Sequence, residues 1–108
     1  MKRTKSMIYK PTTESRELFL YAINTSRLYD CAIVPVVRNL AKKLAKGAFD
    51  SAKAIDAFFP IACEAAKMYA REFAQNPDWN MIFDVTARFT TASDMVDYYM
   101  ENIEKNDL

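Results

Sequence analysis

The chain has 108 residues, the length of one domain, and its 51% hydrophobic and 27% charged residues are the balance of a globular protein rather than a disordered one. One glycine and four prolines leave few residues for tight turns, which disfavours a many-stranded β fold. The net charge of +1 predicts no partner by itself, although residues 1–54 hold eleven Lys/Arg and four Asp/Glu while residues 55–108 hold four and ten.

Residues 1–12 are predicted to form a basic N-terminal arm, followed by a single helical domain over residues 13–108. No apolar segment follows the basic start, so we expect no signal peptide. No apolar run reaches the roughly 18 residues that span a bilayer, so we expect no membrane segment and a cytoplasmic location. Cys31 and Cys63 fit this compartment as free, buried thiols, with a redox pair as the less favoured alternative.

The first predicted helix covers about residues 13–24, with an N-cap at Thr12 or Thr13. The second covers about residues 26–46, where apolar side chains recur at spacings of four and three and form one core-facing stripe. It should end at Gly47, because glycine adopts the left-handed conformation that commonly follows a helix. Pro35 lies inside this helix and should bend or divide it.

The third predicted helix covers about residues 51–75 and contains Pro60, with Asp50 or Ser51 as its N-cap. Only four residues link it to the second helix, so these two helices should form an antiparallel hairpin. A short helical turn beginning at Asn76 precedes the last helix, about residues 85–104, which carries apolar residues at heptad spacing.

The predicted fold class is therefore all-α, an irregular antiparallel bundle of about four helices in which the two long helices are bent or broken at Pro35 and Pro60. The apolar periodicity places one face of each helix against a common core. The residues expected in that core are Leu18, Tyr21, Ile33, Val37, Leu40, Leu44, Ile55, Phe58, Ala62, Tyr69, Phe73, Phe89, Val96, Tyr99 and Ile103.

Five cationic side chains surround the tip of the predicted hairpin: Arg38, Lys42, Lys43, Lys46 and Lys53. Such a cluster can bind phosphates and release counterions, so it is the candidate contact for nucleic acid or another anion. The favoured interpretation is a solvated helix end, because lysines in the last turn also stabilise the helix dipole. No aromatic residue interleaves with these cations in the sequence, so base stacking is not indicated.

The aromatic residues suggest a second kind of surface. Adjacent bulky residues of a helix point in diverging directions, so only one member of such a pair can face the same core. Phe59, Tyr98 and Met100 are the candidate interface residues on this ground, for self-association or for an unknown protein partner. Burial of these side chains within the chain itself is the equally favoured alternative.

Catalytic chemistry finds little support in the sequence. The absence of histidine removes the commonest general base and metal ligand, and two cysteines alone cannot complete a four-ligand zinc site. A single glycine excludes the glycine-rich phosphate-binding loops. We therefore expect no catalytic residue, no metal, no cofactor and no enzymatic activity. An enzyme that works through Asp/Glu and Tyr is the least favoured alternative.

Four stretches carry a resemblance to known proteins: ELFLYAINTSRLY (17–29), VRNLAKKLAKGAFDSAKAIDAFF (37–59), AAKMYAREF (65–73) and DWNMIF (78–83). In these stretches the chain resembles a group of small proteins encoded by bacteriophages, prophages and related bacterial genomes. The resemblance implies a small accessory protein that binds host or phage components, in the cytoplasm of a bacterial host cell if it is phage-encoded, and it transfers no functional residue.

These observations together predict a non-catalytic helical protein that acts by protein–protein association. The alternative is a nucleic-acid-associated accessory protein that binds phosphates through the hairpin tip at residues 38–53. The opposite charges of the two halves of the chain bear on this choice. If acidic side chains of the last helix neutralise the cations of the tip, the alternative loses its basis.

Overall fold

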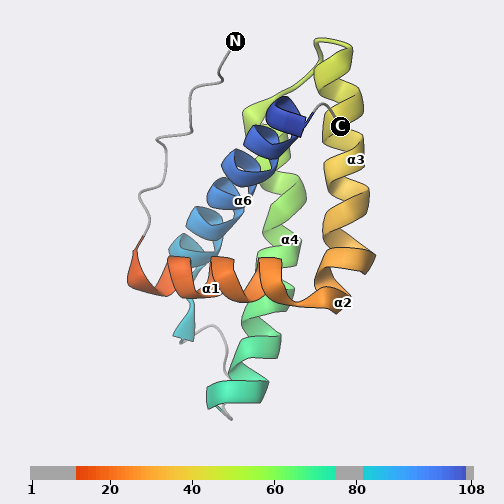
Figure 1. Ribbon diagram of the computed structural model, residues 1–108. Coiled ribbons are helices and arrows are strands. Elements are labelled where there is room, and N and C mark those ends of the chain that lie inside the picture. The colour runs from red at the N-terminus through yellow and green to blue at the C-terminus, as the bar shows by residue number, and fades with distance from the viewer. Residues whose placement is uncertain (1–11, 75–81, 107–108) are drawn as a thin grey trace.

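The structure is a computed structural model that describes residues 12–74 and 82–106, and helices dominate it (Figure 1). The described residues contain no strand, which confirms the all-α prediction. Residues 1–11 of the predicted basic arm and most of the predicted turn after Asn76 lie outside the described residues. The helical elements are α1 (Thr13–Asn24), α2 (Ser26–Leu28), the π-helical segment η1 (Tyr29–Ile33), α3 (Val34–Ala45), α4 (Ser51–Tyr69), the π-helical segment η2 (Ala70–Ala74) and α6 (Val85–Asn106).

Side-chain caps set the starts of α1 and α4, as the sequence predicts. Thr12 and Ser15 form a reciprocal pair, in which Ser15 N donates to Thr12 Oγ1 at 3.1 Å and Thr12 N donates to Ser15 Oγ at 2.8 Å. Asp50 Oδ1 accepts from Ala52 N at 2.9 Å and from Lys53 N at 3.3 Å. These caps satisfy backbone N–H groups that have no partner inside the helix.

Gly47 ends α3 as predicted. Its φ angle of 71° lies in the left-handed region. Gly47 N donates to Leu44 O at 3.1 Å and Ala48 N donates to Lys43 O at 2.8 Å. These two bonds satisfy the last carbonyls of the helix in the Schellman arrangement, so the chain turns sharply into α4.

The two internal prolines have different effects. The second predicted helix is continuous from α2 through η1 to α3, but it changes to π geometry just before Pro35. A proline lacks an N–H and its ring collides with the carbonyl four residues earlier, so a wider turn in which Val34 N donates to Tyr29 O accommodates Pro35. By contrast, α4 passes through Pro60 without a change of helix type.

The core lies where α1 crosses the pair formed by α4 and α6 (Figure 1). Leu18, Phe58 and Val96 are fully buried there, which confirms their prediction as core residues. The other predicted core residues that are buried are Ile33, Leu40, Ile55, Ala62 and Tyr99, whereas Tyr21, Val37, Leu44, Tyr69 and Phe89 are half-buried. The side chain of Ile103 lies outside the described residues.

Phe73 corrects the predicted core. It lies in η2 beyond the packed length of α4, and the residue is 61% exposed. Its ring meets Tyr21 and Tyr69 at centroid distances of 5.9 and 5.0 Å. The heptad period therefore continues past the end of the core, because periodicity identifies an apolar face but does not show where other helices cease to pack against that face.

Two tyrosines join α1 to the far end of α4 and η2. Tyr21 Oη donates to Glu72 Oε2 at 2.8 Å, and Tyr69 Oη donates to Glu17 Oε2 at 3.4 Å. Burial, followed by Glu72, raises the pKa of Tyr21, and burial, followed by Glu17, raises the pKa of Tyr69. Both phenols therefore remain protonated donors at neutral pH.

Candidate functional site: a cleft between α3 and α6

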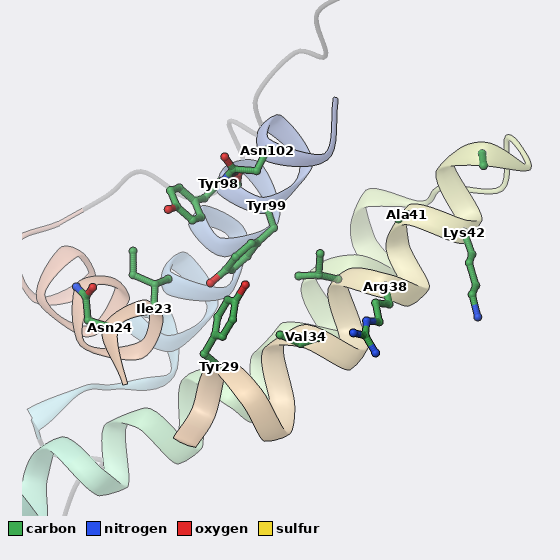
Figure 2. A pocket seen from close by; sticks show the side chains of 12 residues that line it. Ile23, Asn24, Tyr29, Val34, Arg38, Ala41, Lys42, Tyr98, Tyr99 and Asn102 are labelled. Atoms are coloured by element: carbon green, nitrogen blue, oxygen red, sulfur yellow. Dashed lines mark hydrogen bonds between the residues drawn. The ribbon is translucent and has the colours of Figure 1, made fainter. Parts of the chain in front are cut away.

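A cleft of about 890 Å³ opens between α3 and α6 (Figure 2). It forms because α3 packs against α6 far less extensively than α4 does, so part of the inner face of α3 has no helix against it. The residues that line the cleft are Ile23, Asn24, Tyr29, Val34, Val37, Arg38, Ala41, Lys42, Ala45, Tyr98, Tyr99 and Asn102. Clefts of this size with mostly apolar walls and a few polar groups are the usual form of binding sites.

The α3 wall of the cleft is an apolar stripe. Val34, Val37, Ala41 and Ala45 recur at spacings of three and four, so they lie on one side of the helix. Val37 was predicted in the core, and it is only half-buried because it faces this cleft. Two of the four side chains are alanines, which leave room for another backbone to approach closely.

The α6 wall is aromatic and is held in place by internal packing. The Tyr98 ring meets Phe19 edge-on at a centroid distance of 5.5 Å and meets Tyr99 edge-on at 4.9 Å. The Tyr99 ring is stacked on Phe58 of the core at 5.8 Å. These contacts fix both rings of the wall before anything binds.

Two phenol hydroxyls converge inside the cleft. Figure 2 shows the hydroxyl of Tyr29, which lies in η1, pointing toward the hydroxyl of Tyr99 from α6. Neither hydroxyl has a hydrogen-bond partner among residues 12–74 and 82–106. Burial raises the pKa of Tyr99, and Tyr98 and Tyr29 add to the effect. The Tyr99 hydroxyl is therefore a neutral donor at physiological pH.

The structure divides the five cations of the hairpin tip. Arg38 and Lys42 line the cleft and project from the same side of α3, one turn apart (Figure 2). Lys43, Lys46 and Lys53 lie at the tip without lining the cleft. Within the described part of the chain, none of the five forms an ion pair, so no acidic residue described on α6 is paired with them.

Of the three candidate interface residues, only Tyr98 lies at the cleft, and 42% of its surface is exposed. Phe59 is half-buried, because its ring stacks on Phe89 at 4.1 Å and lies 5.6 Å from the Arg88 guanidinium carbon. Met100 is fully buried, so its side chain does not reach the surface.

Both cysteines are free, as predicted, but their burial differs from the expectation. Cys31 is exposed, because it lies on the outer side of η1. Cys63 is partly buried, and its Sγ accepts a hydrogen bond from Arg88 Nη1 at 3.2 Å.

Sequence reasoning did not predict the cleft. The sequence indicates no role for Tyr29, predicts Tyr99 only as a core residue, and does not indicate base stacking, because no aromatic residue is near the cations along the chain. The fold brings Tyr98 and Tyr99 to the same cleft as Arg38, about 60 residues away along the chain. The adjacent tyrosines 98 and 99 were the one signal available, since a single helix face cannot bury both.

No helix within the described ranges combines the length and the apolar character needed to cross a membrane. Across those same ranges, no three Cys, Asp or Glu side chains gather closely enough to hold a metal ion. Comparison of the chain with protein-family models, curated proteins and solved structures finds no significant match to any of them.

Proposed function

We propose that the protein is a non-catalytic binding module whose α3–α6 cleft receives a helical segment of a protein partner. The observation that carries the proposal is the apolar stripe of α3, which no described helix covers. An amphipathic helix lies in such a groove with its apolar residues at spacings of three and four. The stripe repeats with the same period, so the two helices would match along their length.

The dimensions and composition of the cleft support a helical occupant. The 12 residues of α3 rise about 18 Å, which corresponds to about three turns of a bound helix. Tyrosines are enriched at interface centres because they add large contact area at low entropic cost. The tyrosine wall here is already packed on Phe58 and Phe19, so little ordering is required on binding.

Filling the cleft is expected to abolish binding. We would select 18-residue helical peptides from a display library on the wild-type protein and measure their affinity for Ala41→Trp and Ala45→Trp. Ala57→Trp is the matched control, since Ala57 is an exposed helical alanine of α4 that does not line the cleft. An indole in the cleft should weaken selected peptides by at least about tenfold, whereas the control should leave their affinity unchanged.

The folding of each variant is checked by circular dichroism, and Ala45→Trp is the safer of the two because Ala45 is exposed. A library that yields no peptide sensitive to the cleft-filling variants would contradict the proposal. Light scattering gives the oligomeric state of the same samples. A wild-type dimer that becomes monomeric only when the cleft is filled would identify the partner as a second copy of the chain.

Nucleic-acid binding by the hairpin tip is the second candidate, because its five cations have no ion pair among the described residues. If it is correct, fluorescence anisotropy of labelled DNA and RNA should show affinity that falls by orders of magnitude between about 50 and 200 mM salt. The triple variant Lys42→Glu, Lys43→Glu, Lys46→Glu should then lose binding. Arg16→Glu, Arg27→Glu, Arg71→Glu has the same net charge and serves as the control. Equal effects of the two triple variants, or no binding at low salt, would eliminate this candidate.

A further inference from the structure

We infer that the helix received by the α3–α6 cleft is acidic, with one carboxylate held between the hydroxyls of Tyr29 and Tyr99 and others paired with Arg38 and Lys42. This inference rests on the proposed function and adds the chemical class of the partner. It follows from two features of the cleft that an apolar groove does not require: converging donors without partners, and cations without counter-charges.

The first feature is the pair of hydroxyls. Tyr99 is only 7% exposed, yet its hydroxyl points into the cleft toward Tyr29 and has no acceptor among the described residues (Figure 2). Because this hydroxyl opens into the cleft rather than being sealed in the core, it is available to donate to a bound acceptor. A carboxylate has two oxygens and several lone pairs, so it can accept from both phenols at once.

The second feature is the charge of the cleft. Among the residues whose side chains are described, Arg38 and Lys42 are the charged ones that line it, and no Asp or Glu of that set does so. They are four residues apart on α3, so a helix lying along α3 would meet them with carboxylates three or four residues apart. Neither cation has an ion pair within the described ranges, so binding would not have to break one.

An acidic helix fits these observations better than a nucleic acid does. A single-stranded nucleic acid needs open aromatic faces for base stacking. Here one face of Tyr99 is covered by Phe58 at an interplanar angle of 9°, and Tyr98 packs edge-on against both Phe19 and Tyr99. Tyr99 therefore offers mainly its hydroxyl and its edge to the cleft, which suits a carboxylate acceptor.

The experiment uses the helical display library with Glu, Gln, Lys and Arg equally frequent at the positions outside the apolar face. Selection is on the wild-type protein, with removal of peptides that also bind Ala41→Trp. We expect Glu to be enriched at positions three or four residues apart along one flank. Replacing those Glu residues by Gln in a selected peptide should weaken binding by about tenfold or more, because charged hydrogen bonds are lost.

Variants of the protein test which side chains of the cleft contact the carboxylates of the bound peptide. Tyr29→Phe and Tyr99→Phe should each weaken the selected peptide by about five- to tenfold, while Tyr69→Phe is the matched control, because Tyr69 does not line the cleft. Arg38→Gln and Lys42→Gln should weaken the peptide and flatten its salt dependence. Lys43→Gln and Lys53→Gln lie outside the cleft and should not.

The outcomes separate this inference from the proposed function. Cleft-dependent peptides in which Glu is not enriched, or in which Gln replaces Glu without loss, overturn the acidic partner and leave the proposed function standing. Enrichment of Lys or Arg does the same. Failure to obtain any cleft-dependent peptide overturns both the acidic partner and the proposed function. Both are also overturned if an oligonucleotide displaces a selected peptide from the wild-type cleft and an acidic peptide does not.

Discussion

Phe58→Ala should lower the free energy of unfolding by about 3–5 kcal/mol, the range for truncating a buried aromatic side chain. Phe58 is fully buried on α4 and its ring stacks on Tyr99 of α6 at a centroid distance of 5.8 Å and an interplanar angle of 9°. Its removal leaves a cavity between the two helices that form the largest contact of the fold. Because a domain of this size is stable by only about 5–15 kcal/mol, the variant should unfold at much lower urea concentration.

Phe73→Ala is the matched control, since it makes the same chemical change in η2, the segment that directly follows α4. Phe73 is 61% exposed, so its truncation should cost less than about 1 kcal/mol. Urea denaturation followed by circular dichroism measures both. Similar losses for the two variants would mean that the core does not lie between α4 and α6 as the structure has it.

Tyr99→Phe should change the alkaline stability of the protein far more than its stability at neutral pH. An unfolded tyrosine titrates near pH 10, whereas burial raises the pKa of folded Tyr99 above that value. Below about pH 10 both states hold the proton, so stability is unaffected. Above it the unfolded state releases the proton first, and the free energy of unfolding falls by up to about 1.4 kcal/mol per pH unit.

The Phe variant lacks this proton and should therefore lose less stability between about pH 10 and 12. At pH 7 the two proteins should be similar, because the Tyr99 hydroxyl has no hydrogen-bond partner within the described ranges. Tyr21 and Tyr69, whose pKa values are also raised, contribute equally to both proteins. Thermal melts at several pH values provide the measurement. Parallel pH curves for wild type and Tyr99→Phe would contradict the burial assigned to this phenol.

The same substitution links stability to binding. Tyr99 packs its ring on Phe58 and presents its hydroxyl to the cleft, so it belongs to the core and to the candidate site at once. Replacing it by Phe keeps the ring and removes only the donor. A folded variant that is as stable as wild type at pH 7 and binds acidic helices less well would therefore assign the loss to the hydroxyl.

Local signals in the sequence determined where the helices of this protein begin and end. The Thr12 and Asp50 caps and the turn at Gly47 depend on hydrogen bonds between residues within five positions of one another. They can therefore be predicted from the local sequence. The apolar period of residues 85–104 likewise predicted α6 and its buried Val96 and Tyr99.

The tertiary structure alone decided which apolar surfaces are covered. Periodicity predicted Val37 and Phe73 as core residues, but α3 stands away from α6 at Val37 and the core ends before Phe73. Cys31 is exposed for the same reason, since a helix face is buried only where another element packs on it. The cleft joins Tyr29, Arg38 and Tyr99 from three separate helical segments, and their proximity depends on how those segments pack rather than on any local pattern.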